Sequence, residues 1–500
     1  MAPLDESDSS KDSYPRYSSD EESSYGWRSP LVASTNSSPL KRAQHYGQAH
    51  PRRLLSAGVA LLVMVVLWIS TRHVPEPWQP QRRWKEQRPQ LSFFETGDRR
   101  GGRVPGVKEL LTPQAPSTSY HQSLRTDLRY LTSDSWSGLT GQFFTALSLL
   151  HLAQLTQRVA IIPSWRDDGH YGPVITRMSL LFDMDRFRNE TGSLFVEWDD
   201  VKPSRAKEET PTEELGCFKA SWFENALTFG DHNLRQTVWD VPRPGQDTVW
   251  SYESFTLYDY ESRLRLEGAR RISEETKTPL PRNIAEETAD AGLLCYTNLW
   301  DLQHAGNGLK SGPMVPLLAE PLRGVHPEWY SVGKYIDFAP AIWDVALDCA
   351  HRTLGISSRK LPPLLTVHIR RGDFLDWCEK HENCTPTLDA YIPKVNDLLR
   401  NMPSNTKILV TSDETTDEAF LSGIDALGWL RVNHLALGTA ARLEQQFGDS
   451  ARWADGAVDQ ALLSLGSAFV GTEGSQVSQI SELRVKSWNA GQTAMVPRPI

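Results

Sequence analysis

The chain lacks an excess of basic residues. Among its 500 residues, 53 are Lys or Arg and 62 are Asp or Glu, which gives a formal net charge of −9. The isoelectric point of about 5.9 excludes a nucleic-acid-binding protein that relies on bulk positive charge. We therefore expect no nucleic-acid partner, and an anionic substrate must be held by a few placed cations.

Long apolar runs are also scarce, which excludes a protein with several membrane spans. The one such run, Leu54–Ser70, has 17 residues without a charge. As a helix it would extend about 25 Å, enough for a thin bilayer. It begins too far from the N-terminus and is too long for an ordinary signal-peptide core. We predict one transmembrane helix, with a signal-peptide core and a buried core helix as the alternatives.

Two segments of biased composition flank this run. Residues 1–53 are rich in Ser and lack apolar periodicity, which predicts a disordered tail. Residues 71–118 are dominated by Pro, Gln and Arg, which predicts a spacer between the membrane and the folded part. Basic residues stand on both sides of the run, so charge alone leaves its orientation open.

Cysteine is rare, with five residues in the chain. Because the number is odd, at least one cysteine has no intrachain partner. Cys378 and Cys384 lie six residues apart in a polar segment, and we predict a disulfide between them in an oxidising compartment. The pairing of Cys217, Cys295 and Cys349 stays open. We expect no metal site, because the chain has neither a CxxC pair nor a cluster of histidines.

Aromatic residues are plentiful instead, with 17 Trp, 14 Tyr and 16 Phe, so the chain has ample material for a core. From Leu124 onward, short apolar runs alternate with longer amphipathic ones. Strands are predicted at residues 158–163, 364–370, 407–412, 430–432 and 468–470. Helices are predicted at residues 143–155, 388–399, 415–427, 457–465 and 476–486. Residues 200–300 are predicted to be irregular.

This alternation predicts an α/β fold with parallel, doubly wound sheets. We expect an N-terminal α/β domain at residues 119–345 and a C-terminal α/β domain at residues 346–500. In such folds, ligands bind at the carboxyl ends of the strands. Polar residues follow three of the predicted strands at these ends, at 370–373, 412–414 and 471–475.

The sharpest motif is His368-Ile369-Arg370-Arg371-Gly372-Asp373, at the end of a predicted buried strand. Alternate residues of a strand share a face, so His368 and Arg370 point the same way. The planar guanidinium of Arg370 can donate two hydrogen bonds to a diphosphate. Asp373 can fix that Arg or balance its charge. The structural alternative is a strand-end ion pair without a ligand.

A second motif, Gly471-Thr472-Glu473-Gly474-Ser475-Gln476, lies between a predicted strand and a predicted helix. Backbone N–H groups and the helix dipole favour an anion at such a point. Ser475 and Gln476 can add side-chain donors, although Ser475 is also an ordinary helix cap. Asp459, in the preceding helix, can accept a hydrogen bond from a base or a ribose, or it can cap the helix.

Three blocks carry a resemblance to a known family. The HIRRGD strand, the strand that ends in Ser412-Asp413 and the block at 459–479 occur in this order and together resemble the GDP-fucose-dependent fucosyltransferases. These include the protein O-fucosyltransferases and the α1,6-fucosyltransferases. The stretch at 138–165 resembles their N-terminal block. The resemblance covers roughly residues 136–165 and 364–485.

The resemblance implies a GT-B fold, in which two Rossmann-type domains face a cleft. It implies metal-independent, inverting transfer of fucose from GDP-fucose to a hydroxyl of a protein or glycan acceptor, with no cofactor beyond this donor. It also implies a single-pass type II protein of the Golgi or endoplasmic reticulum membrane, with the catalytic part luminal. The sequons at Asn189 and Asn383 would then be glycosylation acceptors.

The resemblance also implies roles for individual residues. Arg370 would hold the donor phosphates and assist the departure of GDP, and Asp373 would pair with it. The remaining implied contacts of the donor are His368 and Asp459 with the nucleotide and Ser475 and Gln476 with the phosphates.

One block departs from the family's pattern. Protein O-fucosyltransferases carry a Glu or an Asn in the N-terminal glycine-rich turn, near the acceptor hydroxyl. Here the turn is Ser137-Gly138-Leu139-Thr140-Gly141-Gln142, with neither residue. The catalytic base and the acceptor therefore stay open, with Asp373, Asp376 and Glu379 as nearby carboxylates.

Two alternative functions remain. The first is a membrane-anchored protein that binds a sugar nucleotide or a glycan with a degenerate transferase fold. The second is a metal-dependent GT-A transferase that uses Asp183 and Asp185 as its metal site.

Overall fold

A computed structural model describes residues 103–135, 137–167, 171–204, 212–218, 227–239, 292–297, 299, 327–358, 360–376 and 385–498. These residues all lie in one compact unit, Gln79–Ile500. The tail predicted at 1–53 and the membrane helix predicted at 54–70 lie outside the described residues, as do Cys378, Glu379, Asn383 and Cys384. Among the helices of the described residues, none has the length and apolar character needed to cross a membrane.

The N-terminal half is built on a six-stranded sheet in the order β5-β2-β1-β8-β6-β7, and all its strand pairs are parallel. Its strands are β1 (Tyr130–Ser133), β2 (Val159–Ile162), β5 (Phe195–Glu197), β6 (Glu213–Phe218), β7 (Leu234–Trp239) and β8 (Leu293–Tyr296). The prediction of an irregular segment at 200–300 is therefore wrong where these residues are described. β6 and β7 mix polar with apolar residues, so neither shows the continuous apolar run of a buried strand.

A disulfide joins two neighbouring strands of this sheet. Cys217 in β6 and Cys295 in β8 are bonded, with their Cα atoms 4.4 Å apart and a sequence separation of 78. Both are buried, and Cys349 is a free, buried cysteine. A crosslink that closes so long a loop restricts the unfolded chain and contributes about 2–4 kcal/mol of stability.

The helix that follows β1 packs against elements of both halves. α4 (Leu139–Leu155) starts four residues earlier than predicted, inside the glycine-rich turn. It is buried along most of its length and apolar on all sides, as expected of a helix packed on every face. It contacts β1 and β2 of its own half and α19 and α20 of the other half.

The remaining elements of the N-terminal half are short. β3 (Trp165–Asp167) and β4 (Gly172–Thr176) form an antiparallel hairpin. The short helices are α2 (Val107–Leu110), α3 (Tyr120–Ser123), α5 (Met178–Leu181), α6 (Met184–Thr191), α7 (Trp198–Val201) and α8 (Leu227–Gly230). Leu110 and Leu111 are buried, and Tyr130 donates a hydrogen bond to the Leu110 carbonyl at 2.6 Å. The folded part thus begins within the spacer predicted at 71–118, before residue 119.

The C-terminal half is built on a five-stranded parallel sheet in the order β11-β10-β9-β12-β13. Its strands are β9 (Leu364–Ile369), β10 (Lys407–Ser412), β11 (Leu430–Arg431), β12 (Ala468–Thr472) and β13 (Gln492–Val496). The chain winds from β9 outward to β11 and then returns to the other side of β9. This is the doubly wound order of a Rossmann-type sheet, which confirms the predicted α/β class with parallel sheets.

Helices cover both faces of this sheet, so its central strand is buried on both sides. α12 (Pro327–Ser331) contacts α4 of the N-terminal half. The helices around this sheet are α13 (Pro340–Leu354), α14 (Gly372–Asp376), α15 (Leu388–Leu399), α16 (Glu418–Ala426), α17 (His434–Leu437), α18 (Thr439–Phe447), α19 (Ala451–Ser464) and α20 (Gln476–Asn489). Val367 and Ile369 of β9 join the core that contains α15 and α16 side chains. The alternate residues Thr366 and His368 instead bond to α19 and α20.

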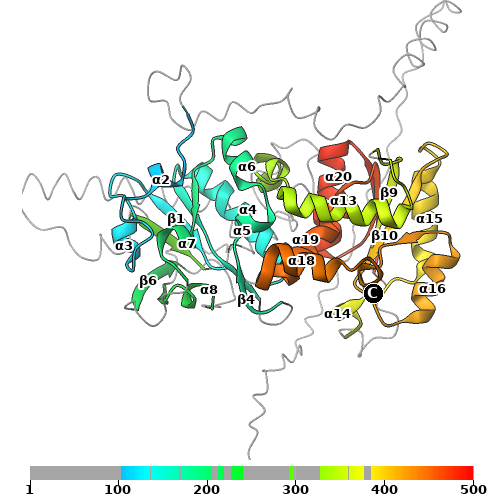
Figure 1. Ribbon diagram of the computed structural model, residues 1–500. Helices are drawn as coiled ribbons and strands as arrows, with labels where there is room; N and C mark the ends of the chain where they lie inside the picture. The colour runs from blue at the N-terminus through cyan, green and yellow to red at the C-terminus, as the bar shows by residue number, and fades with distance from the viewer. Residues whose placement is uncertain are drawn as a thin grey trace, which may run out of the picture. The chain divides into compact units, whose positions relative to one another are not determined.

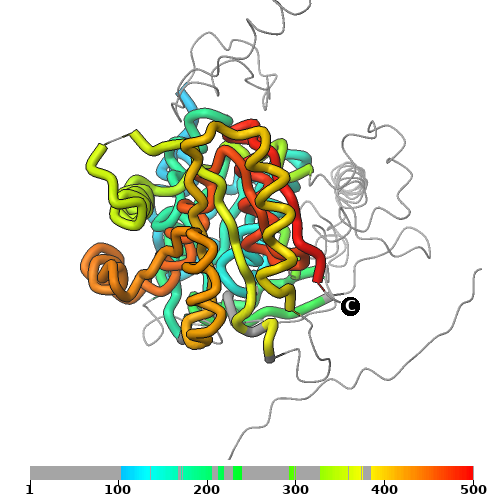
Figure 2. Tube along the Cα trace, turned by 90° about the vertical axis from the view of Figure 1, so that its right-hand side faces the viewer, coloured from blue at the N-terminus to red at the C-terminus, as the bar shows by residue number. Residues whose placement is uncertain are grey.

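The two halves share one hydrophobic core. Trp165 of β3 lies 6.3 Å from Trp453 of α19, centroid to centroid. A buried line of hydrogen bonds also joins them, in which Arg484 donates to Gln460 and Gln460 donates to Thr140 of α4. Figure 1 shows the blue-to-green and yellow-to-red elements side by side, and Figure 2 shows the C-terminal half from its own side. The domain boundary expected at 345/346 falls within α13.

Candidate functional site

The strand order of each sheet has one switch point, where neighbouring strands lead the chain in opposite directions. A ligand-binding crevice is expected there, at the carboxyl ends of the strands. In the C-terminal sheet the chain leaves β9 in one direction and β12 in the other, and a ligand-binding crevice opens at such a switch point. Arg370 follows β9, and the turn at 473–475 follows β12. In the N-terminal sheet the same point lies between β1 and β8, and the segment that includes the glycine-rich turn follows β1.

Arg370 is fixed at both its backbone and its side chain. Its amide donates to Thr472 Oγ1 at 2.9 Å, which ties the end of β9 to the end of β12. Its guanidinium forms an ion pair with Asp413, which follows β10, and lies 5.4 Å from the ring centroid of Phe374. The side chain keeps 23 % of its surface exposed. The structure therefore places a partly exposed guanidinium at the switch point, as the sequence predicted.

Asp413 is the site residue that the sequence analysis did not single out. Besides pairing with Arg370, its carboxylate accepts the Arg371 N–H at 2.8 Å. It sits directly against Gly372, where any side chain would collide with it. Asp373 lies in α14 and its side chain is not among those described, so its pairing with Arg370 stays a prediction. The same holds for Asp376 as a nearby carboxylate.

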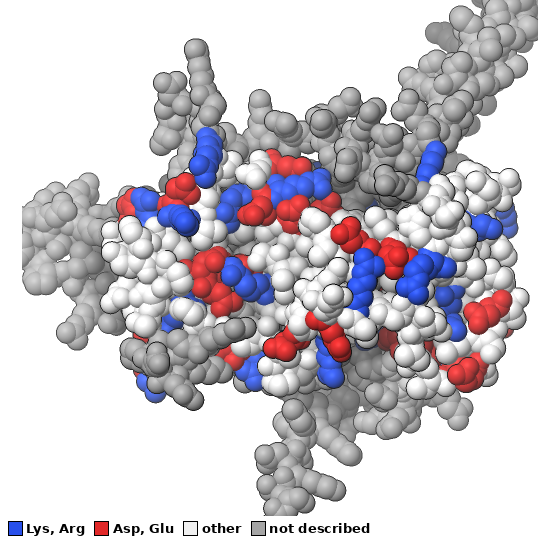
Figure 3. Space-filling model, viewed as in Figure 1, with Lys and Arg blue, Asp and Glu red and all other residues white. Residues whose placement is uncertain are grey.

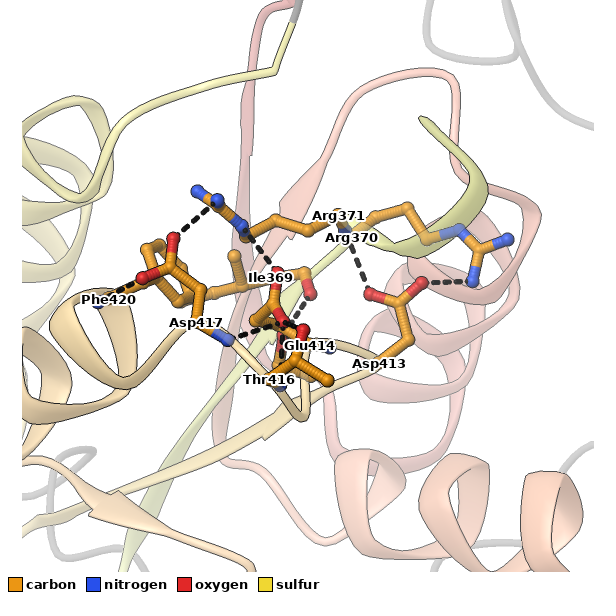
Figure 4. Close-up of polar contacts among 9 residues, drawn as sticks. Ile369, Arg370, Arg371, Asp413, Glu414, Thr416, Asp417 and Phe420 are labelled. Carbon is orange, nitrogen blue, oxygen red and sulfur yellow. Dashed lines mark hydrogen bonds and ion pairs between the residues drawn. The ribbon is translucent and has the colours of Figure 1, made fainter. Parts of the chain in front are cut away.

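Arg371 points away from Arg370 and has a structural role (Figure 4). Its guanidinium bonds to Glu414 and Asp417 at 3.2 and 3.0 Å and lies 4.1 Å from the ring centroid of Phe420. Burial alone would raise the pKa of Glu414, but backbone amides and Arg371 outweigh it and lower this pKa to about 2. Glu414 is thus a carboxylate committed to holding the loop after β10.

A network of hydrogen-bonded side chains fixes the backbone at Arg370. Thr472 Oγ1 accepts the Arg370 N–H, donates to the His368 carbonyl and is hydrogen-bonded to the Tyr391 hydroxyl at 2.6 Å. Ser478 Oγ lies 2.7 Å from His368 Nδ1 and accepts the Thr472 N–H. Four side chains from β9, β12, α15 and α20 therefore hold the strand end in place.

His368 faces this network rather than open solvent. Only 5 % of its surface is exposed, and burial, with a smaller effect of the Arg370 charge, lowers its pKa to about 3. It is therefore a neutral imidazole at physiological pH. Its expected contact with a nucleotide stays a prediction.

Ser475 and Gln476 begin α20 beside Arg370. The Ser475 side chain accepts the Ser478 N–H at 3.3 Å, so it caps the helix, which is the structural alternative stated for it. The amides of Gln476 and Val477 belong to the first turn, where a helix has no internal acceptor for them. Two backbone donors and the positive end of the helix dipole thus point out of this turn.

The glycine-rich turn of the other half lies against the start of α20. A Cβ at Gly141 would stand 3.1 Å from Gln476 Oε1 and 2.6 Å from both Cβ and Oγ of Ser137. The turn is clamped by Gln142, which is fully buried and donates to the carbonyls of Ser137 and Arg166 at 2.6 and 3.0 Å. The glycine-rich turn therefore packs closely against the start of α20.

Asp459 belongs to a separate charged pair on α19. His434 Nε2 lies 2.9 Å from Asp459 Oδ1, and its Nδ1 lies 3.1 Å from Thr439 Oγ1. Burial would lower the pKa of His434, but the Asp459 carboxylate raises it to about 11. Asp459 also acts electrostatically on His368. It is thus near the site, and its contact with a nucleotide stays a prediction.

Asp183 and Asp185, the metal site of the GT-A alternative, both lie at the start of α6. Asp183 caps α6, with its carboxylate accepting the Arg186 N–H at 3.0 Å, and Asp185 is exposed on the same helix. Within the described ranges, no three His, Cys, Asp or Glu side chains are grouped as metal ligands. A helix cap accounts for the Asp-x-Asp spacing.

The face shown in Figure 3 carries its charges as mixed acidic and basic groups rather than as one large patch of either sign. One such group joins Arg186 to Glu190 and Asp337. An anion on this face would then be held by a few local cations rather than by a broad field.

Comparison with known proteins gives a limited result. No protein-family model and no curated protein sequence matches this chain. The chain is similar to a crystal structure of POFUT1 in complex with GDP-fucose, at 13 % identity and a TM-score of 0.46, over 75 % of this chain and 99 % of that one. It is also similar to a mutant of Arabidopsis thaliana FUT1 in complex with GDP, at 12 % identity and a TM-score of 0.37, over 75 % and 71 % of the two chains.

A third similar structure is the fucosyltransferase NodZ from Bradyrhizobium, at 14 % identity and a TM-score of 0.36, over 72 % of this chain and 94 % of that one. The resemblance to fucosyltransferases that the motifs indicate is thus found again among solved structures, at low sequence identity.

Proposed function

We propose that this protein is a glycosyltransferase that moves fucose from GDP-fucose to a hydroxyl of a protein or a glycan, with inversion and without a metal ion. In this proposal its two halves are the domains of a GT-B fold. The N-terminal half, to about residue 345, serves the acceptor and the C-terminal half holds the donor. One transmembrane helix at 54–70 anchors it in the Golgi or endoplasmic reticulum membrane, with the catalytic part luminal.

One observation carries this proposal. A partly exposed guanidinium, Arg370, follows β9, and the first turn of α20 follows the adjacent strand β12, so cationic and N–H donors lie at the carboxyl ends of the two strands at the switch point of a Rossmann-type sheet. The glycine-rich turn of the second sheet closes the same point from the other side. Cationic and N–H donors around one crevice suit a diphosphate, and a second domain opposite it suits an acceptor.

The chemistry needs these donors most in the transition state. The bond from C1 of fucose to the β-phosphate oxygen breaks, and its electron pair leaves with GDP. The acceptor oxygen bonds to C1 and gives up its proton. Charge grows on the leaving diphosphate as the bond breaks, so donors fixed there by Asp413 and α20 stabilise the transition state more than the ground state.

The alternative of a binding protein without turnover is favoured by one observation. The glycine-rich turn at 137–142 carries neither the Glu nor the Asn that protein O-fucosyltransferases carry there. The two candidates differ in a single measurement, the release of GDP from GDP-fucose, because a pure binding protein releases none.

The proposal is tested by measuring the melting temperature of the full chain with GDP, UDP, CMP, GDP-fucose and GDP-mannose. We expect GDP and GDP-fucose to raise the melting temperature and UDP and CMP to leave it unchanged. A shift with UDP alone would reject the GDP-fucose assignment. No shift with any member of the panel would reject a nucleotide-sugar site at this crevice.

A second prediction concerns Ser475. Ser475→Ala removes the cap of α20 but leaves the backbone amides in place, so we expect unfolding to become easier by about 1 kcal/mol. Affinity for GDP should fall by a similar free energy, roughly fivefold. Denaturant unfolding and calorimetry measure the two effects. Ser481→Ala in the same helix, whose buried hydroxyl has no hydrogen-bond partner among the described residues, is the matched control and should bind GDP normally.

A further inference from the structure

Ser137 has a strained backbone at the centre of the proposed site. Its φ of 87° lies in the left-handed region, where glycine is the usual residue. The other described residues that share this feature without being glycine are Gln157, Asn233 and Ala490. Such a conformation costs on the order of 1 kcal/mol, and it persists only where the surroundings impose it.

The surroundings of Ser137 do impose it. The buried amide of Gln142 donates to the Ser137 carbonyl at 2.6 Å and to the Arg166 carbonyl at 3.0 Å. Its oxygen accepts from the Ser135 hydroxyl at 2.9 Å and from the Arg166 amide at 3.3 Å. With every donor and acceptor engaged, this amide holds the turn in one shape.

The imposed conformation directs the Ser137 side chain toward a specific place. Its Cβ and Oγ occupy the position that a side chain at Gly141 would take, beside Gln476 Oε1. Ser137 is half-buried, and its hydroxyl makes no hydrogen bond to any residue that the structure describes. A polar group is therefore held next to the start of α20 without a protein partner among these residues.

We infer that the Ser137 hydroxyl binds a hydroxyl group of the sugar that the nucleotide carries. The inference rests on the proposed function. If the diphosphate lies against Arg370 and the first turn of α20, the sugar attached to it lies beside Gln476 and the exposed part of the Ser137 side chain. A sugar hydroxyl both donates and accepts, as does Ser137, so either partner can supply the hydrogen.

The test compares the affinities of the full chain for GDP and for GDP-fucose by calorimetry. Ser137→Ala removes the hydroxyl and keeps the backbone strained, whereas Ser137→Gly removes both the hydroxyl and the strain. We expect both variants to bind GDP as the wild type does and to bind GDP-fucose about five- to tenfold more weakly. If Ser137 only stabilised the fold, its substitution would change the affinities for GDP and for GDP-fucose by the same factor.

Gln157→Gly is the matched control, because Gln157 has a φ of 54° and lies exposed just beyond the other end of α4. It should bind both ligands as the wild type does. The inference is overturned if GDP-fucose affinity is unchanged in Ser137→Ala, or if it falls in Ser137→Gly alone. If the wild type binds neither GDP nor GDP-fucose, the proposed function itself fails, and this outcome is distinct from the other two.

Discussion

Arg370→Lys should lower GDP release from GDP-fucose about a hundredfold while leaving the fold intact. Lysine keeps the positive charge and can still pair with Asp413. It loses the planar fork, so it cannot make two parallel hydrogen bonds to a diphosphate. Losing one such donor in the transition state costs about 3 kcal/mol, which is about a hundredfold in rate. Initial rates at saturating GDP-fucose measure this effect.

The neighbouring arginine provides the control for this substitution. Arg371→Lys makes the same chemical change one residue later, but its guanidinium binds Glu414 and Asp417 and points away from the crevice. We expect it to lower the melting temperature and to keep most of the turnover. If Arg370→Lys retains near-normal turnover, the diphosphate assignment fails, and the proposed fucosyl transfer loses its main support.

The sequence was a good guide to the central strands of the C-terminal sheet but not to β1 and β8, which lie buried at the centre of the N-terminal sheet and were not predicted. β9 and β10 are continuous apolar runs, and their predicted ranges agree with the structure to within a residue. The amphipathic helix α15 matches its predicted range of 388–399. β6, β7 and β13 were missed because their residues mix polar and apolar types, and only their neighbours in the sheet make them strands.

Some residues of the candidate site could be placed from the sequence, and others could not. Arg370 and Ser475 could be placed at one edge of the sheet because both follow buried strands and parallel strands share their carboxyl edge. The pairing of Arg370 with Asp413 depends on the register that sets Ile369 opposite Ser412, which no residue pattern reveals. The signal was nevertheless present, since Ser412-Asp413 ends the strand adjacent to the arginine motif.

Asp183 and Ser475, two other residues that the sequence suggested for ligand binding, each have a local structural role. Asp183 is spaced like a metal ligand, but three residues later its helix offers an N–H that its carboxylate accepts. Ser475 caps α20 in the same way. Short polar side chains at the start of a helix satisfy the backbone first, so their presence at a motif is weak evidence for a ligand.

The free energy of unfolding should be greatest near pH 6.5. Two histidines cause this, because one loses its stabilising contribution as the pH falls below 6.5 and the other as the pH rises above it. The pKa of His368 is lowered to about 3 by burial, so the unfolded chain takes up its proton below 6.5 while the folded chain does not. This contribution to stability is complete above pH 6.5 and is lost as the pH falls toward 3. The slope is about 1.4 kcal/mol per pH unit.

His434 acts in the opposite direction. Its pKa is raised to about 11 by Asp459 against the effect of burial, so the folded chain keeps a proton that the unfolded chain loses above 6.5. Its contribution is complete below pH 6.5 and is lost as the pH rises toward 11, with a comparable initial slope.

Two variants separate these contributions from those of the other titrating groups. His368→Asn keeps a partner for Ser478 at the position of Nδ1, and His434→Gln keeps one for Asp459 at the position of Nε2. Urea unfolding between pH 4.5 and 9 should show a flatter acid limb in His368→Asn and a flatter alkaline limb in His434→Gln, relative to the wild type. An acid limb that is unchanged in His368→Asn would show that this histidine is charged in the folded protein, and it could not then lie neutral beneath Arg370.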